Sequence, residues 1–148
     1  MMRDGKITSL KNKANKAQAK GDLKQAVDYY LEIMDLEPDD PNIPKEIASI
    51  YDKMGKKDKA IEYYWKAMEQ YVDSEYFQNA TAIAQMLLRM GEDELVIKQE
   101  LAFLYEKQGL IGDAVSAYEE VAELYREDGD IEGILESFSK IVELTPKK

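Results

Sequence analysis

The 148-residue chain contains no cysteine and no histidine. The missing thiols exclude disulfide bonds and cysteine nucleophiles, and the missing imidazoles remove the commonest general base and a major zinc ligand. No apolar run of about 18 residues occurs, so we expect neither a signal peptide nor a membrane-spanning helix, and a cytoplasmic location. These absences predict a protein that is not an enzyme and that needs no cofactor.

Period-two alternation of apolar and polar residues, the pattern of a half-buried strand, is also missing. Leu, Ile, Tyr and Ala instead recur at intervals of three and four, interrupted by glycines and by a proline-containing stretch at 38–44. The sequence therefore predicts an all-α fold of about eight antiparallel helices. The expected helices lie near residues 7–20, 23–36, 42–54, 57–72, 75–90, 94–107, 111–126 and 130–144.

Basic residues are few and are concentrated at one end of the chain. Lys and Arg number 20 against 30 Asp and Glu, for a formal net charge of −10, yet residues 1–24 hold seven basic and two acidic residues. The remaining body is strongly acidic, which disfavours nucleic acid and anionic membranes as partners. We expect a protein partner, no nucleic acid and no membrane insertion, and we leave a homo-oligomer open.

Residues 41–94 and 95–148 align with each other over 54 positions without a gap. Most of the identical residues are small or aromatic and lie at helical spacing, which indicates two copies of one packing unit. Small residues on either side of Gly55 and Gly109 would let two antiparallel helices approach closely. The identical pairs are Ile43/Ile97, Glu46/Glu100, Ala48/Ala102, Tyr51/Tyr105, Lys53/Lys107, Gly55/Gly109, Ala60/Ala114, Tyr64/Tyr118, Glu69/Glu123 and Tyr71/Tyr125.

Three segments share an order of small residue, glycine, alanine and aromatic residue that resembles the 34-residue tetratricopeptide repeat. The resemblance implies a right-handed α-α superhelix whose stacked helix pairs leave a concave surface for a partner. The residues that carry it are Ala14, Ala17, Gly21, Ala26, Tyr30 and Pro38; Ile47, Ala48, Tyr51, Gly55, Ala60, Tyr64 and Ala67; and Leu101, Ala102, Tyr105, Gly109, Ala114, Tyr118 and Val121.

The 54-residue period exceeds that of the family by one helix and a turn. We therefore expect a flexible N-terminus at 1–6 and one tetratricopeptide-like domain at 7–148. This domain would consist of a repeat at 7–40 and two three-helix units, at 41–94 and 95–148.

The last expected helix has a continuous apolar stripe opposite glutamates and a lysine. An amphipathic helix packs its apolar side inward, so we expect it to close the array with its polar side facing solvent. In the family pattern, Pro146 would end this repeat. The stripe consists of Ile131, Ile134, Leu135, Phe138, Ile141 and Val142.

The stretch DGDIEGILES at 128–137 is similar to a calcium-binding loop. A calcium loop needs a bidentate acid at its twelfth position, and this chain has Ser139 there. The same residues fit the helical repeat, so we expect a structural role and no metal site.

Family position also implies which residues line the partner-binding groove. They lie on the first helix of each expected repeat, where side chains face the concave surface. The candidates are Lys11, Asn15, Gln18, Lys45, Ser49, Asp52, Gln99, Phe103 and Glu106. Phe103 is the natural anchor among them, because an exposed aromatic side chain supplies much of the energy of many protein interfaces.

The pair Lys11 and Asn15 resembles half of the carboxylate clamp with which some tetratricopeptide co-chaperones hold an acidic chaperone tail. The later repeats depart from that clamp, with Glu46, Val96 and Glu100 where the clamp needs Asn, Lys and Arg. A carboxylate facing a carboxylate ligand repels it. Two interpretations of the lysines remain. They are solvated side chains on an end helix, or they form a basic end that orients a partner beside an acidic groove.

The sequence thus predicts an adaptor or scaffold that binds a peptide or helix of another protein in its groove. Two alternatives stay open. A secretion or assembly chaperone would use the same groove on one client protein. A self-assembling structural module would use a terminal face of the array.

Overall fold

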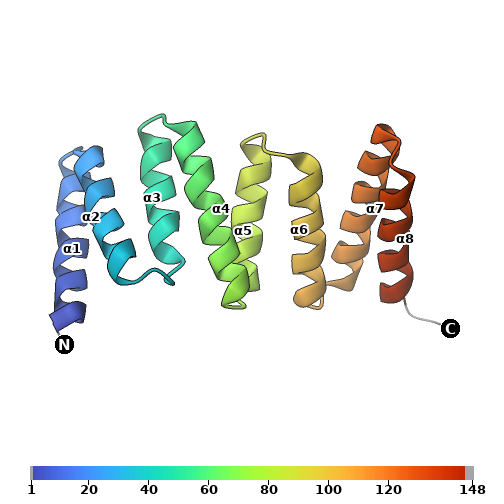
Figure 1. Ribbon diagram of the computed structural model, residues 1–148, viewed down its shortest axis with the longest axis horizontal. Helices are drawn as coiled ribbons and strands as arrows, with labels where there is room; N and C mark the ends of the chain where they lie inside the picture. Colours follow the sequence, from blue (N-terminus) through green and yellow to red (C-terminus); the bar gives the residue numbers. More distant parts are fainter. Residues whose placement is uncertain (1, 146–148) are drawn as a thin grey trace. The chain divides into compact units, whose positions relative to one another are not determined.

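The computed structural model describes residues 2–145, so Met1 and the expected repeat end at Pro146 lie outside the described residues. Residues 2–145 form eight helices and no strand, which confirms the predicted all-α fold (Figure 1). Within these residues, no helix combines the length and apolarity that crossing a membrane requires. The helices are α1 Met2–Ala19, α2 Leu23–Leu36, α3 Asn42–Lys53, α4 Lys57–Asp73, α5 Phe77–Arg89, α6 Glu94–Lys107, α7 Ile111–Asp128 and α8 Ile131–Leu144.

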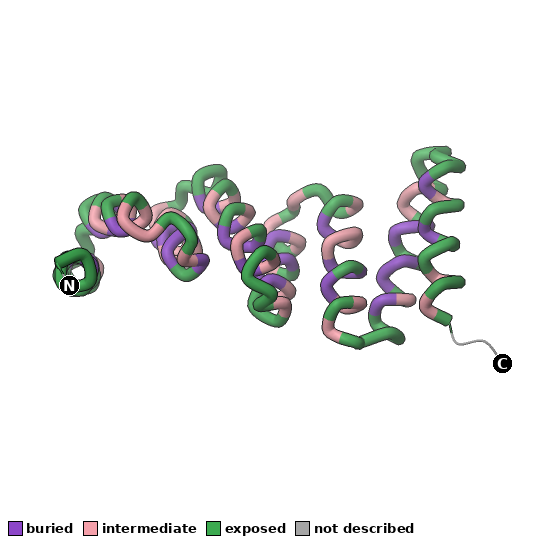
Figure 2. The backbone as a smooth tube through the Cα atoms, turned by 60° about the horizontal axis from the view of Figure 1, so that its bottom comes forward, coloured by how far each residue is buried: buried purple, intermediate pink, exposed green. Residues whose placement is uncertain are grey.

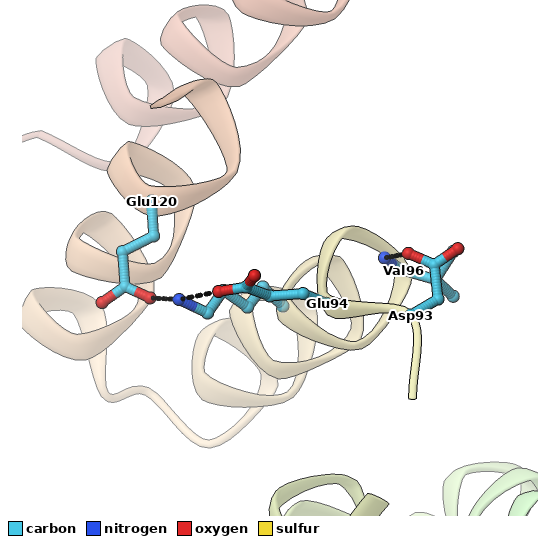
Figure 3. Close-up of polar contacts among 5 residues, drawn as sticks. Asp93, Glu94, Val96 and Glu120 are labelled. Carbon is cyan, nitrogen blue, oxygen red and sulfur yellow. Dashed lines mark hydrogen bonds and ion pairs between the residues drawn. The ribbon is translucent and has the colours of Figure 1, made fainter. Parts of the chain in front are cut away.

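Short polar motifs end and begin these helices. Gly55 ends α3 in the left-handed region at φ 75°, and the N–H of Lys56 donates to the Tyr51 carbonyl oxygen at 2.9 Å. Asp93 begins α6 by accepting a hydrogen bond from the Val96 N–H (Figure 3). Left-handed glycines follow α1, α3, α5, α6 and α7, and aspartates cap α2, α6 and α8. The expected bounds of α2 to α8 agree with the structure to within about two residues.

The period of the internal alignment is visible in the helix positions. Helices α4 and α7 begin at Lys57 and Ile111, and helices α5 and α8 begin at Phe77 and Ile131, so both pairs are separated by one full period. Positions in α3, α4 and α5 therefore have counterparts in α6, α7 and α8.

Contacts group the chain into two compact units, Met1–Ser74 with α1 to α4 and Glu75–Lys148 with α5 to α8. This grouping by contacts is separate from the expected repeat bounds at 40/41 and 94/95, which stay predictions. Within the units, α3 packs on both α2 and α4, while α5 packs on α6. The two units are described separately below.

In the first unit, each helix packs on its neighbour in the chain, α1 on α2, α2 on α3 and α3 on α4. Ala14 and Ala26 are fully buried, so small side chains lie in the core that α1 and α2 share. Residues 2–6, expected to be flexible, belong to α1, and Arg3 lies 3.9 Å from the Glu37 carboxylate. The helix therefore begins five residues before the start expected at residue 7.

In the second unit, α5 packs on α6, α6 on α7 and α7 on α8. Buried positions of α6 and α7 include Ala102, Ala117 and Tyr118, and Figure 2 shows buried stretches along both helices. Lys98 of α6 joins the two helices at their edge, with Nζ 2.6 Å from Glu120 and 3.1 Å from Glu94 (Figure 3). The hydrogen bond to Glu120 raises the pKa of Lys98, which stays charged in the folded protein.

Helix α8 is oriented differently from the expectation. Its buried residues are Gly133 and Ser137, while four of the six stripe residues face solvent. The expectation that the apolar stripe packs inward is therefore wrong. Gly133 lies against the Tyr125 ring, where even a methyl group has no room, so the smallest face of α8 lies against α7.

Glu75, in the turn between α4 and α5, is the only non-glycine residue in 2–145 with a positive φ, at 63°. Its counterpart one period later is Gly129, at φ 73°. At positive φ, the steric strain of a residue with a Cβ exceeds the extra chain entropy that glycine loses on folding. Glu75→Gly is therefore expected to raise the free energy of unfolding by about 0.5 to 1 kcal/mol. Urea denaturation measures this change.

The matched variant is Gly129→Ala, which is expected to lower the free energy of unfolding by about 1 kcal/mol, because it introduces the same backbone strain. A destabilised Glu75→Gly protein would show that Glu75 is not strained.

Candidate binding groove in the second unit

A cavity of about 450 Å³ lies between α6, α7 and α8, and we call it the α6–α8 groove. Side chains from α7 and α8 form most of its lining, and Gln99 alone comes from α6. Such a volume suits one or two side chains of a bound segment. The lining residues are Gln99, Tyr118, Val121, Tyr125, Glu136, Ser137, Ser139, Lys140 and Glu143.

Tyr125 links the three helices at one end of the groove. Its ring lies over Gly133 of α8, and its hydroxyl accepts a hydrogen bond of 2.5 Å from Gln99 Nε2 of α6. On α8, the Ser137 hydroxyl donates to the Gly133 carbonyl oxygen at 2.9 Å, so this small side chain is satisfied within its own helix. The close approach of α8 to α7 therefore depends on small residues, and it holds the tyrosine ring in place.

Tyr118 lies further along α7, towards its N-terminus. Its hydroxyl donates to Glu106 Oε2 of α6 at 3.1 Å. Burial raises the pKa of Tyr118 to about 12, and the hydrogen bond to Glu106 and the nearby Glu143 carboxylate add to the shift. A buried phenol beside two carboxylates resists ionisation. Tyr118 thus stays a neutral hydrogen-bond donor at any physiological pH.

Carboxylates outnumber cations around the α6–α8 groove. Glu136 and Glu143 line it and Glu106 lies behind Tyr118, while Lys140 is the one cation among its lining residues. Lys140 Nζ is 3.9 Å from Glu143, a pair of exposed side chains that attract only weakly. The groove is therefore apolar in its floor, with tyrosine hydroxyls, and acidic at its rim.

The three predicted groove residues of α6 lie at or near this cavity. Gln99 lines the cavity, and Glu106 accepts a hydrogen bond from the hydroxyl of Tyr118, which also lines it. Phe103 is 36% exposed and lies outside the lining, with Lys107 Nζ 5.5 Å from its ring centre. It remains on the same α6 face, because the spacing of 99, 103 and 106 repeats one helical face.

The other six predicted residues lie in the first unit. Lys45, Ser49 and Asp52 are the α3 counterparts of the α6 set, one period earlier, and Lys11, Asn15 and Gln18 lie on α1. Of these six, Lys11, Asn15 and Asp52 are exposed and the others are half-buried. Neither the α1 set nor the α3 set lines a described cavity.

Glu46, which replaces a clamp asparagine, lies near buried tyrosines. Burial raises the pKa of Tyr30 and of Tyr64, and the charge of Glu46 adds to both shifts, together with that of Asp52 at Tyr64. The α3 face thus repeats the pairing of a buried tyrosine with a carboxylate that Tyr118 and Glu106 show in the second unit.

Sequence reasoning missed the contribution of α7 and α8. Tyr118 and Tyr125 both belong to identical repeat pairs, a pattern that indicates packing and not a binding surface. The signal was available in the small residues Gly133 and Ser137, four apart on one face of α8, which indicate a close helix contact.

Within residues 2–145, no cluster of three or more acidic residues has the geometry to hold a metal ion. The stretch that is similar to a calcium loop instead begins α8, where Asp130 Oδ1 accepts a hydrogen bond of 2.9 Å from the Gly133 N–H.

The raised pKa of Tyr118 predicts how stability depends on pH. Between pH 10 and about 12 the unfolded chain releases the Tyr118 proton and the folded chain retains it, so the free energy of unfolding falls as pH rises through this window. Tyr118→Phe has no proton to release, and it is expected to make this decline shallower. Urea denaturation at pH 9, 10, 11 and 12 tests this, and an unchanged slope would contradict the buried hydrogen bond.

Residues 46–71, from the middle of α3 to near the end of α4, match the tetratricopeptide repeat family. This segment is similar to a tetratricopeptide repeat. This repeat has its counterpart one period later, where α6 and α7 supply one wall and the floor of the α6–α8 groove. No curated protein matches the sequence.

Several solved structures are similar to the chain. The N-terminal domain of stress-induced protein-1 (STI-1) from C. elegans is 20% identical, with a TM-score of 0.49 over 97% of both chains. The Sgt2 TPR domain from Aspergillus fumigatus is 21% identical, with a TM-score of 0.42 over 96% of this chain and 85% of that one. MamA from Desulfovibrio magneticus RS-1 is 13% identical, with a TM-score of 0.44 over 94% of both.

Proposed function

We propose that this protein binds a segment of another protein, and that the α6–α8 groove of the second unit holds part of that segment. The tetratricopeptide repeat supports a role in protein interaction. The observation that carries the specific site is the cavity of about 450 Å³, whose floor combines apolar surface with tyrosine hydroxyls. Mixed apolar and hydrogen-bonding surfaces of this kind are typical of binding sites.

The chemistry of the groove defines the bound segment. Val121 and the rings of Tyr118 and Tyr125 offer an apolar floor, and Glu136 and Glu143 stand at the rim. A segment with one or two apolar side chains followed by Lys or Arg would satisfy both. An acidic tail would meet the carboxylates and be repelled.

Phe103 extends the same surface along α6. Its ring is partly exposed, and Lys107 lies over it, so a bound segment could displace the lysine and cover the ring. We propose that Lys45, Ser49 and Asp52 of α3, and Lys11, Asn15 and Gln18 of α1, form further contacts with the partner. The protein then acts as an adaptor, with no catalytic role.

The experiment compares two charge reversals with equal effect on net charge. Glu143→Lys changes the groove rim, whereas Glu127→Lys changes an exposed position of α7 that does not line the groove. Each variant and the wild type capture proteins from a lysate of the source organism, and mass spectrometry identifies them. We expect proteins held by the wild type and by Glu127→Lys to be lost with Glu143→Lys and with Phe103→Asp.

The captured partner is then divided into overlapping peptides, and the dissociation constant of each is measured by fluorescence anisotropy. A basic, partly apolar peptide that binds the wild type at least ten times more tightly than Glu143→Lys is the expected result. Equal capture by all four proteins, with unchanged helicity and melting, would refute the groove assignment.

A further inference from the structure

Helix α8 presents a row of large apolar side chains to solvent. The four residues are spaced by four, three and four positions, which places them along one face of the helix. Single exposed apolar residues are ordinary, but a contiguous row marks an interaction surface. The row, called the α8 stripe, consists of Ile131, Leu135, Phe138 and Val142, exposed by 71%, 62%, 50% and 68%.

The internal repeat shows what covers the corresponding face of α5. The counterparts of the α8 stripe in α5 are Phe77, Thr81, Ala84 and Leu88, and in the same unit α6 packs on α5. Ala84 is fully buried, and Thr81 Oγ1 accepts a hydrogen bond of 2.9 Å from Gln108 Nε2, which directly follows α6. Within this chain, then, α6 lies across the face of α5 that corresponds to the α8 stripe.

The covering helix for α8 must differ from α6 in shape. Leu135 and Phe138 stand where α5 has Thr81 and Ala84, so the α8 stripe is bulkier at its centre. A helix that approaches it as closely as α6 approaches α5 needs a small residue opposite Phe138. Its other contacts with the stripe must be apolar.

Charges beside the α8 stripe define the edges of the covering helix. Glu132 and Glu136 lie along one side of it on α8. On the other side, a cavity of about 410 Å³ between α7 and α8 is lined by Phe138, Glu119 and Glu123, and its one cation, Arg126, is paired with Glu123. Both edges therefore favour Lys or Arg on the occupant.

A second copy of the chain fits this surface less well than such a partner. In an antiparallel two-fold pair of α8 helices, the side that carries Glu132 and Glu136 would face itself and repel. The N-terminal α1 is basic, but all of its large apolar residues from Ile7 onward are buried, so its outer face offers the stripe nothing to pack.

We propose that the α8 stripe binds one amphipathic helix of another protein, with an apolar face, a small residue at its centre and Lys or Arg along both edges. The helix covers α8 as α6 covers α5. None of the four stripe residues lines the α6–α8 groove, although Glu136 stands at the rim of the groove and at the edge of the stripe.

The test uses a fluorescein-labelled, helix-stapled peptide long enough to follow the whole stripe. It carries leucines at the spacing of the α8 stripe, alanine at its centre and lysines along both edges. A composition-matched isomer distributes the same leucines around the helix. Anisotropy titrations are made with the wild type, Leu135→Glu, Glu136→Lys and Phe103→Asp, and sedimentation velocity of each protein without peptide measures self-association.

We expect Leu135→Glu and the isomer each to weaken binding at least tenfold, Glu136→Lys to weaken it severalfold, and Phe103→Asp to leave it unchanged. Leu135→Glu makes the surface more acidic, so binding that relies on charge alone would survive or strengthen, and that result would overturn the proposal. A peptide that does not bind would also overturn it. So would a wild-type dimer that Leu135→Glu converts to monomer, because a second copy would then cover the stripe.

Discussion

Replacing Gly133 with alanine is expected to lower the free energy of unfolding by about 2 kcal/mol, even though alanine favours helix more than glycine does. The added Cβ would lie deep inside van der Waals contact of the Tyr125 ring atoms Cγ, Cδ1 and Cε1. The ring or the whole of α8 must then move. Displacing the ring also removes the hydrogen bond between Tyr125 and Gln99, so binding in the α6–α8 groove should weaken as well.

Thermal and urea denaturation test this expectation, with Gly112→Ala as the matched control. Gly112 lies in α7 with nothing within 4 Å of an added Cβ, so its replacement should leave stability unchanged or slightly raised. In a protein that already carries Tyr125→Ala, the clash is absent, so Gly133→Ala should lower the free energy of unfolding by less than it does in the wild type. Equal stability of Gly133→Ala and the wild type would show that α8 does not lie this close to α7.

A second large effect is expected in the core of the second unit. Leu104 of α6 is fully buried, so Leu104→Ala should lower the free energy of unfolding by about 3 kcal/mol through lost apolar burial and the cavity that remains. Val96→Ala on the same helix is the control, because Val96 is 41% exposed and its truncation should change the free energy by less than about 0.5 kcal/mol. Similar losses for the two variants would mean that α6 is packed on a different face.

The sequence was sufficient to place the helices, apart from the start of α1. The apolar period of three to four residues, the left-handed Gly55 and Gly109, and the caps at Asp22 and Asp93 are local features, and local geometry translates them directly into helix boundaries. The internal alignment likewise matched α3, α4 and α5 with α6, α7 and α8, because the residues that pack and the residues that end helices recur at one fixed interval.

The orientation of α8 could not be predicted in the same way. Its amphipathic pattern indicates which residues share a face, but not which face the neighbouring helix takes. Burial of Gly133 and Ser137 depends on the shape of α7, where the Tyr125 ring fills the space that a larger residue would need. The side that packs is therefore selected by small size rather than by apolarity.

The candidate site could be predicted only in part, because it too depends on how the helices pack. Family position indicated Gln99, Phe103 and Glu106, which share one face of α6. The α7 and α8 residues of the groove come together only when three helices are packed, and no local pattern reports that packing. Phe103 alone was weighed as an anchor, whereas the structure adds Tyr118 and Tyr125 as the residues that shape the cavity.

Site-specific photo-cross-linking in cells of the source organism tests the central claim most directly. A photoreactive phenylalanine replaces Lys140 at the groove rim in one strain and Glu127, outside the groove, in another. We predict that position 140 cross-links to a basic, partly apolar segment of one partner protein, that Glu143→Lys abolishes this product, and that position 127 gives none. A partner joined at 127 and absent at 140 would contradict binding in the α6–α8 groove.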